Sequence, residues 1–508
     1  MPEPRNEKFR VAEYSETLAA ILRRADELGV YAIARVQDSQ SRSLSLSNGR
    51  LETISQAMLA GVGLQVFTQE GFTSFICSDE INPAIGRELV ETAASMAHSG
   101  SGFATRPSRA VFDLTPDGVA TYWSGYKSLD ETDYPELVKQ MTEANEAARR
   151  YGSHLVVRTQ LSLTDTHWRI VRSDGTDLSF DQPTSLASHT ITAIGSASRL
   201  PVNLGATISG ADDSILLQPA SRNLWELRTR NAAHLATALT DAPLLPASHS
   251  NRGYKLILDY ALAKGLAHEA FGHASESDVM ATSVLGDHGK MRLGEQLGPD
   301  TVTITDGSIL GDYAYQPISA CGKPRQTVNI MEEGRLVAGL ADLFSAEKAG
   351  LVASGAERVE SYRHLPLPRM SNIRITLKDP APFDRPFEEI TPLELQARLI
   401  EIGYIKEGEP CLYLAGYNGG QVMPKEGDFV FNCAAIYDLS LAQPKLYQPA
   451  IFSGKILSVL QSIQGGLGPL HLDAQGHCGK GGQNVPSSGG SHSFIVIAPN
   501  EQIFVGGR

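Results

Sequence analysis

Turn-forming residues are spread along the whole chain and divide its apolar residues into short runs. The 508 residues include 47 Gly and 27 Pro. The longest apolar runs, such as 412–417 and 494–499, have about the length of one strand. None approaches the roughly 20 residues that a membrane-spanning helix requires. The sequence therefore favours a fold with many turns and strands, and no contact with a membrane is expected.

Helical patterns interrupt these strands in the first half of the chain. Asn82 and Pro83 suit the N-cap and the first position of one of these helices. Apolar residues recur at helical spacing in four segments that we predict as helices, namely 17–29, 82–98, 129–151 and 219–239. Strand patterns lie between them, with turn signals at Asn48-Gly49, Glu70-Gly71 and Asp174-Gly175.

A segment rich in proline and small polar residues, 241–253, is the best linker in the chain. It divides the chain into residues 1–245 and residues 246–508, and the first part can be divided further at about residue 125 into 1–125 and 126–245. We expect an α+β protein, in which an N-terminal α/β region of hairpins and helices precedes a β-rich C-terminal domain. That domain begins with a strand at 254–260, continues into a helix, and has a second helix at 392–402.

Charge and cysteine content limit the class of protein. The 44 Lys and Arg residues and 57 Asp and Glu residues give a net charge of −13, so no basic surplus is available for a nucleic acid. The N-terminal residues lack a signal-peptide pattern, and five cysteines are too few for a disulfide scaffold. We therefore expect a soluble, cytoplasmic protein in a reducing compartment, with at least one unpaired cysteine.

Two histidines, His268 and His273, flank Glu269 at a spacing of i and i+5. On a regular helix of about 3.6 residues per turn they diverge by about 140°, so they cannot bind one metal ion together. A π-type turn would bring them to one face, and Gly272 makes such a distortion easier. The pattern predicts a helix with a widened turn at 268–273; the alternative is an ordinary helix with one capping or core histidine.

A metal ion on both imidazoles would place Glu269 next to a metal-activated water, where its carboxylate could act as general base. A catalytic zinc usually has three protein ligands, so a third is needed. Cys321 and Cys478 are expected in polar loops flanked by glycine and are the better candidates, and Lys480 would favour the thiolate of Cys478. The other cysteines lie in apolar strand patterns and are expected to be buried, namely Cys77, Cys411 and Cys433.

Several segments resemble the TldD/PmbA family of metallopeptidases. The resemblance covers about residues 40–508 and is far more specific than the two histidines alone. The segments that carry it are GRLETIS (49–55), GVGLQVF (61–67), HEAFGHASESD (268–278), ESYRHLPLPRMSN (360–372) and HCGKGGQNVP (477–486).

The resemblance implies a zinc ion, one per catalytic subunit, bound by His268, His273 and Cys478, with Glu269 as the catalytic residue. PmbA-type (TldE) subunits lack the metal motif, so this chain resembles the catalytic, TldD-type subunit. Family members cut flexible peptides inside a dimer, often with a non-catalytic partner, and some mature modified natural-product peptides. The resemblance thus implies a homodimer or a heterodimer with a PmbA/TldE-type subunit.

Some residues depart from the family pattern or have open roles. Gln65 stands where an arginine is expected, and residues 433–476 match only loosely. We expect Glu276 and Asp278 to orient His273 or to order the following loop, with a solvated helix end as the alternative. His471 and His477 lie near Cys478 in sequence; His477 is either a contact in the site or a solvated loop residue. An arginine set that could hold a peptide carboxylate or form surface ion pairs comprises Arg358, Arg363 and Arg369.

Three functions are consistent with these residues. The first is a zinc peptidase that hydrolyses short or unfolded peptides. A sheet edge near the metal could hold such a peptide as an added strand. The second is a dedicated amide hydrolase for one modified small molecule or natural-product peptide, which the loosely matching 433–476 region motivates. The third is a scaffold subunit with a structural metal. Two imidazoles and a thiolate favour zinc over other divalent metals.

Overall fold

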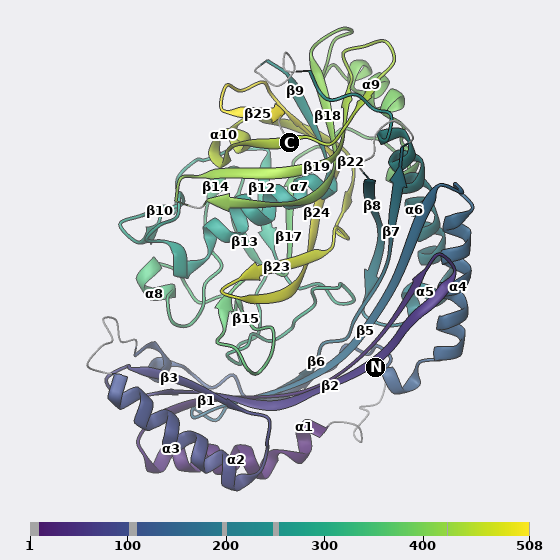
Figure 1. The fold of residues 1–508 in the computed structure, drawn as a ribbon. Coiled ribbons are helices and arrows are strands. Elements are labelled where there is room, and N and C mark those ends of the chain that lie inside the picture. The colour runs from purple at the N-terminus through teal and green to yellow at the C-terminus, as the bar shows by residue number, and fades with distance from the viewer. Residues whose placement is uncertain (1–9, 101–108, 196–200, 247–252, 424, 507–508) are drawn as a thin grey trace.

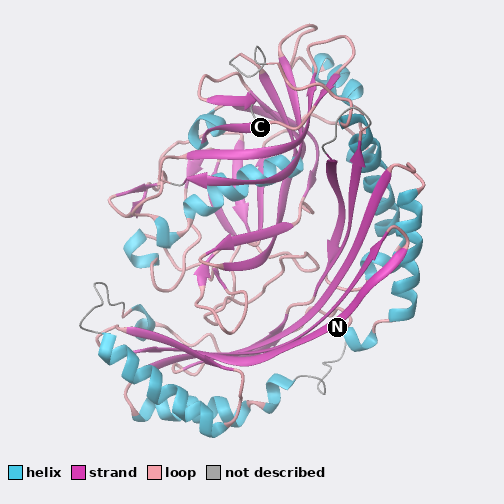
Figure 2. Ribbon diagram, viewed as in Figure 1, coloured by secondary structure: helices cyan, strands magenta, loops and turns pink. Residues whose placement is uncertain are grey.

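The computed structural model describes residues 10–100, 109–195, 201–246, 253–423 and 425–506. Two large sheets dominate the fold, and helices cover the outer face of the first (Figure 1). The mixture of long sheets and helices confirms the predicted α+β class (Figure 2).

The first sheet has eight strands and follows the order β3-β2-β1-β5-β6-β4, with β7 between β5 and β8. Its strands are β1 (Tyr31–Ser47), β2 (Arg50–Phe67), β3 (Thr73–Ser78), β4 (Val119–Tyr122), β5 (Leu155–Arg172), β6 (Asp177–Asp181), β7 (Thr184–Ile194) and β8 (Pro201–Gly210). The strand β1 pairs with β2 on one side and with β5 on the other. The regions 1–125 and 126–245 therefore share one sheet, and the proposed division into domains stays a prediction.

The turn between β1 and β2 lies at the predicted dipeptide. Asn48 and Gly49 have φ values of 48° and 82°, the left-handed conformation that a two-residue hairpin turn requires. The predicted turns at Glu70-Gly71 and Asp174-Gly175 also connect paired strands. Residues 50–55 of the segment GRLETIS and all of GVGLQVF lie in the single 18-residue strand β2.

Helices pack on the convex face of this long, curved sheet (Figure 1). α2 and α3 cover β1 and β2, where Leu18, Ile21 and Val90 enter one core. α4 and α6 cover β5, β7 and β8 around a second core that includes Met141 and Trp225. The helices of this half are α1 (Arg10–Glu13), α2 (Ser15–Glu27), α3 (Pro83–Gly100), α4 (Tyr134–Arg149), α5 (Ser214–Leu217) and α6 (Pro219–Leu239), with 3₁₀ turns at Ala110–Asp113 and Leu129–Glu131.

Residues from 255 onward form a 13-stranded sheet that lies on the concave side of the first sheet (Figure 1). Its main order is β14-β13-β12-β17-β24-β9-β18-β19-β21-β25; β20 pairs with β19, and β22 and β23 pair with β24. These strands are β9 (Lys255–Asp259), β12 (Val302–Asp306), β13 (Val328–Glu332), β14 (Arg335–Leu336), β17 (Asn372–Leu377), β18 (Cys411–Met423), β19 (Asp428–Asp438), β20 (Lys445–Tyr447), β21 (Ile451–Lys455), β22 (Ile463–His471), β23 (Gly476–Lys480), β24 (Gln483–Ile497) and β25 (Ile503–Gly506).

Smaller elements complete this half of the chain. Two short ribbons join β10 (Gly286–Asp287) to β11 (Lys290–Met291) and β15 (Glu357–Arg358) to β16 (Leu367–Pro368). The helices are α7 (Tyr260–Gly265), α8 (Ala346–Ala349), α9 (Pro392–Glu401) and α10 (Ile456–Gln461), with a π-helix at Leu266–Gly272 and 3₁₀ turns at His273–Ser275, Ser277–Val279 and Phe387–Glu389.

Hydrogen bonds join the two halves across the concave face of the first sheet. The backbone N–H of Tyr362 donates to Oε1 of Gln37 at 2.9 Å, and Nη1 of Arg172 donates to the carbonyl of Cys321 at 3.4 Å. Residues 247–252 of the predicted linker lie outside the described residues. Within the part of the chain that the structure describes, no helix has both the length and the apolar character needed to cross a bilayer.

Candidate metal centre

The strand β9 leads directly into the helix that carries the two histidines. At the junction, the side chain of Asp259 accepts hydrogen bonds from the backbone N–H groups of Leu262, at 2.8 Å, and Gly416, at 2.6 Å. This caps α7 and ties it to β18, because one carboxylate serves both elements. Burial raises the pKa of Asp259 to about 6.

The helix widens where the two histidines lie. α7 ends at Gly265, and Leu266–Gly272 form a π-helix that passes into a 3₁₀ turn at His273. The predicted widened turn is therefore present, although the segment 261–278 is not one regular helix. Gly272 has an ordinary helical φ of −59°; its missing side chain matters because a Cβ there would lie 2.5 Å from Sδ of Met370.

The hairpin β23–β24 brings Cys478 to these histidines. Cys478 lies within β23 and is fully buried, so its placement in a polar loop was wrong. Its Sγ lies 3.5 Å from Nε2 of His273. One potential ligand atom from each of His268, His273 and Cys478 lies within 4.8 Å of the others, so the three predicted ligands come together.

These three residues suit a metal ion with soft and borderline ligands. His268 is 2% exposed, and its Nδ1 has no hydrogen-bond partner among the described residues. Burial, followed by the charge of Lys264, holds the pKa of His268 well below its usual value, so the imidazole is neutral and can donate a lone pair. A buried imidazole nitrogen without a partner, beside a second imidazole and a thiol, fits a zinc ion.

The charge environment also favours the thiolate of Cys478. Burial alone would raise the pKa of this thiol, but the hydrogen bond and charge of His273, and then the Arg369 guanidinium, bring it below the usual value. Nε of Arg369 lies 3.3 Å from Sγ, and its Nη2 donates to the carbonyl of the same cysteine. Arg369 is therefore the cation in contact with Sγ, whereas Lys480, for which the sequence suggested this role, pairs with Glu276 and Asp278.

Lys480 instead completes a chain of polar contacts behind His273. The carboxylate of Glu276 lies 3.1 Å from Nδ1 of His273 and 2.8 Å from Nζ of Lys480. Lys480 also donates to Asp278 at 2.8 Å. Because Glu276 contacts Nδ1, the other ring nitrogen, Nε2, is turned toward Cys478. This arrangement agrees with the expectation that an acidic residue orients the imidazole of His273. Among the described residues, the side chain of Asp278 bonds to Lys480 and not to His273.

Glu269 lies beside the three ligand candidates and opens to the same cavity. Its Oε1 accepts a hydrogen bond from the hydroxyl of Tyr417 at 3.5 Å. Burial raises the pKa of its carboxyl above the usual value, while His273 and Lys264 act in the opposite direction. Tyr417 and Lys264 were not identified from the sequence, because neither lies in a recognisable motif.

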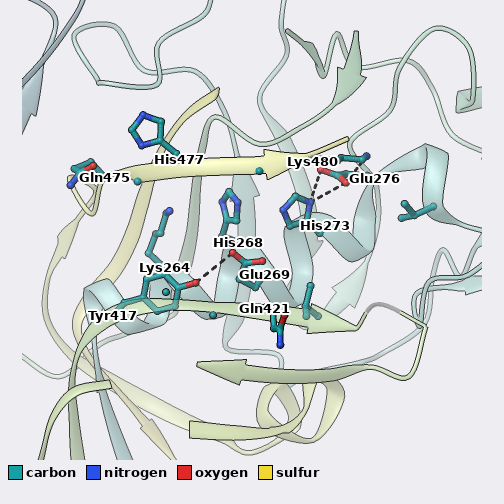
Figure 3. A pocket seen from close by; sticks show the side chains of 16 residues that line it. Lys264, His268, Glu269, His273, Glu276, Tyr417, Gln421, Gln475, His477 and Lys480 are labelled. Atoms are coloured by element: carbon teal, nitrogen blue, oxygen red, sulfur yellow. Dashed lines mark hydrogen bonds and ion pairs between the residues drawn. The ribbon is translucent and has the colours of Figure 1, made fainter. Parts of the chain in front are cut away.

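A cavity of about 690 Å³ extends from these side chains between β23 and β18. Figure 3 shows Lys264, His268 and Glu269 pointing into the space between the strand that carries His477 and the strand that carries Tyr417 and Gln421. His477 is exposed, lines the cavity and makes a hydrogen bond of 3.1 Å with the hydroxyl of Tyr313.

Other candidates from the sequence lie away from the ligand cluster. Cys321 packs in a core with Leu343 and Tyr362, where burial holds its pKa well above the usual value. His471 lies in β22 and contacts Ser493. Gln65 lies in β2, and its Nε2 donates to Oγ1 of Thr73.

The three arginines differ in their surroundings. Arg358 is buried and donates to the carbonyls of Met370 and Pro486. Arg363 is partly exposed and pairs with Asp79 at 2.8 Å. Of the three, Arg369 is the one that contacts a candidate metal ligand, and only its position in the fold reveals this.

The fold resembles known structures over nearly its full length. It matches TldE from Thermococcus kodakarensis with a TM-score of 0.67 at 14% identity, covering 97% of this chain and 100% of that one. A DNA gyrase modulator candidate from Thermotoga maritima matches with a TM-score of 0.72 at 17% identity, with 97% and 100% covered. At these identities the likeness concerns the fold.

Sequence relatives are metalloproteases. A metalloprotease of Methanocaldococcus jannaschii is 26% identical over 489 residues, which cover 93% of this chain and 97% of that protein. A zinc metalloprotease TldD homolog of Saccharolobus solfataricus is 28% identical over 247 residues, covering 47% of this chain and 49% of that protein.

Two domain models of one family match the chain. The first domain of the PmbA/TldA metallopeptidases matches residues 32–97, and the C-terminal domain matches residues 250–486. The second range contains both histidines, Glu269 and Cys478. The chain therefore belongs to the PmbA/TldD family and is a metallopeptidase.

Proposed function

We propose that the chain is a zinc-dependent peptidase of the TldD type that hydrolyses amide bonds of short or unfolded peptides. The observation that carries this proposal is the cluster of His268, His273 and Cys478, whose ligand atoms lie within 4.8 Å of one another beside Glu269. These three residues would hold one zinc ion. When bound there, the ion supplies a Lewis acid that activates water and polarises the amide carbonyl.

The side chains of this site have separate tasks in the proposed reaction. Glu269 accepts a proton from the attacking water and returns it to the leaving amine, with Tyr417 holding its Oε1. Glu276 keeps His273 in the orientation that turns Nε2 toward Cys478. Arg369 stabilises the negative charge on Sγ of Cys478.

The open side of the site supports a catalytic metal rather than a structural one. A structural zinc is enclosed by four protein ligands, whereas a catalytic zinc keeps a position open. Here the cavity of about 690 Å³ reaches His268, Glu269 and His273. This argues against the alternative of a scaffold subunit with a structural metal.

The walls of the cavity suit an extended peptide. Residues 475–477, 479 and 480 line one wall, and residues 419–422 line the other. Among the described residues, β23 pairs only with β24, so its second edge is open to a further strand. Strand addition selects extended chains over folded ones, which supports short or unfolded peptides as substrates.

A dimer is part of the proposal. The fold matches TldE from Thermococcus kodakarensis over nearly the whole chain, which supports an assembly from two subunits of this architecture. We therefore propose a second copy of the chain, or a PmbA/TldE-type subunit, as the partner.

Metal removal tests the proposed function. We expect 1,10-phenanthroline to abolish cleavage of unfolded casein and stoichiometric zinc to restore it, with about one zinc per chain by elemental analysis. The non-chelating isomer 1,7-phenanthroline is the control. Cleavage that survives complete zinc removal would refute the metal mechanism. Failure to cleave casein, with cleavage of one modified peptide only, would instead favour the dedicated amide hydrolase.

Replacing Glu276 by Gln is expected to weaken zinc binding by about 10- to 100-fold, because residues that orient a ligating histidine typically contribute this much to metal affinity. Competition with a chromophoric chelator measures the change. Asp278→Asn is the matched control, since Asp278 contacts Lys480 but not His273. An equal loss in both variants would mean that Glu276 has no special role in orienting the histidine.

A further inference from the structure

Lys264 occupies an unusual position at the end of α7. Its side chain is 5% exposed, and it lines the metal cavity together with Glu269 and His268 (Figure 3). It also lines a second cavity, of about 1040 Å³, that lies between α6, α7 and β18. Tyr417 and Gln475 line both cavities as well, so Lys264 stands where the two meet.

The amino group of Lys264 has fewer partners than it can engage. Among the described residues, Nζ makes one hydrogen bond, to Oγ of Ser487 at 3.1 Å, and no carboxylate lies within ion-pair distance. An ammonium group has three N–H donors, so two remain for another acceptor. Burial lowers the pKa of Lys264, because the charged form loses its solvation, and an anion beside Nζ would offset this cost.

The negative groups around Lys264 are already engaged elsewhere. Glu269, Cys478 and Asp312 are the acidic groups that act on it electrostatically. Glu269 accepts from Tyr417, Cys478 lies against Arg369, and Asp312 accepts from Ser488 and from the backbone of Ala314. The protein therefore does not supply Lys264 with a direct carboxylate partner.

A neighbouring glycine keeps the space beside Nζ accessible. A Cβ built on Gly476 would lie 3.3 Å from Nζ of Lys264 and 3.8 Å from Oγ of Ser487. Gly476 is in β23, the strand that forms one wall of the metal cavity. The missing side chain leaves room for a substrate group to approach the ammonium.

We propose that Lys264 is a specificity-determining residue that binds a carboxylate of the substrate near the scissile amide. This inference rests on the proposed peptidase function and deepens it. Lys264 would select peptides that present an acidic group at the junction of the two cavities. The carboxylate can come from the free C-terminus of a peptide or from an Asp or Glu side chain.

Three versions of one peptide that the wild type cleaves distinguish these sources. The first has a free C-terminal carboxylate and no acidic side chain, the second has a C-terminal amide, and the third has a C-terminal amide and one Glu near the cleavage site. For the zinc-loaded full-length protein, we expect the KM of one of the two acidic versions to be about 10- to 100-fold lower than the KM of the amide version without Glu. A hydrogen bond to a charged group contributes on this scale. The version that is favoured identifies the source.

Lys264→Met should remove this preference, so that the KM values of the acidic and amide versions converge, while Lys264→Arg should retain part of it. Lys348→Met, at an exposed position in α8, is the control. Calorimetry provides a readout without turnover. It measures how tightly the acid and amide versions bind to two zinc-loaded proteins, the Glu269→Gln variant and the double variant that also carries Lys264→Met. Zinc contacts are common to both backgrounds, so the difference reports on Lys264.

Gly476→Ala provides a second route if Lys264→Met fails to fold, because its Cβ would narrow the approach to Nζ and lower the preference for the acid. Equal KM values for the acidic and amide versions in the wild type would overturn the inference and leave the peptidase function intact. A loss of kcat in Lys264→Met that is the same for all three versions would also overturn it, because the lysine would then act on the reacting carbonyl. Failure of the wild type to cleave any unfolded peptide would refute the peptidase function itself.

Discussion

Glu269→Gln is expected to lower kcat for peptide hydrolysis by about 100- to 10,000-fold, the range typical for removal of a general base. The amide keeps the size of the side chain and an oxygen that can accept from Tyr417, but it cannot take a proton from water. Glu269 is not one of the three clustered ligand candidates, so zinc content and KM should stay close to those of the wild type. Steady-state kinetics on a fluorogenic peptide, with zinc analysis of the same sample, measure both.

Glu347→Gln is a suitable control, because Glu347 is exposed in α8 and the same chemical change there should leave kcat unaltered. A Glu269→Gln protein that retains zinc and full kcat would contradict the assignment of Glu269 as general base. A variant that loses zinc would show that the carboxylate contributes to holding the metal.

Cys478→Ser is expected to reduce zinc affinity by more than about 100-fold and to abolish hydrolysis at limiting zinc. Even residues that only orient a ligand contribute about 10- to 100-fold, and Cys478 is the one anionic donor in the cluster. Its replacement also leaves the Arg369 guanidinium, which is fully buried, without the negative charge at 3.3 Å. Chelator competition and elemental analysis measure the zinc, and thermal unfolding reports on the structural cost.

Cys77→Ser is the matched control for this variant, since Cys77 lies in β3, remote from the cluster in the fold (Figure 1), and is partly exposed, where the sequence had wrongly predicted a buried residue. Cys321→Ser tests the second cysteine that the sequence offered as a ligand. If zinc binding were lost with Cys321→Ser and kept with Cys478→Ser, the proposed ligand set would be incorrect.

Local signals in the sequence predicted local structure well. The hairpin at Asn48-Gly49 and the cap at Asn82 are found as expected, with Oδ1 of Asn82 accepting from the N–H groups of Ala84 and Ile85. The predicted helix at 219–239 has the same bounds as α6. Turns and caps depend on residues two to four positions apart, so a short stretch of sequence contains all the interactions that determine them.

The extent of the strands was harder to predict. β2 continues through 18 residues because β1 pairs with it along its whole length and β3 pairs with residues 62–67 at its end. Similarly, Cys478 lies in a strand because 476–480 pair with 483–487. Gly-rich segments look like loops in the sequence, since glycine disfavours strands locally, but pairing with a neighbouring strand overcomes this preference.

The sequence by itself determined the α+β class, the widened turn that carries His268 and His273, and, through a family resemblance, the three residues that the fold brings together. The tertiary structure alone decided which groups surround them. Cys478 lies 205 residues after His273 and meets it only because the β23–β24 hairpin packs against the helical segment that begins with α7. The same packing places Arg369 beside the thiol and leaves Lys264 buried without a carboxylate partner among the described residues. Charge and burial depend on every neighbour in space, and neighbours from distant segments leave no pattern in the sequence around each residue.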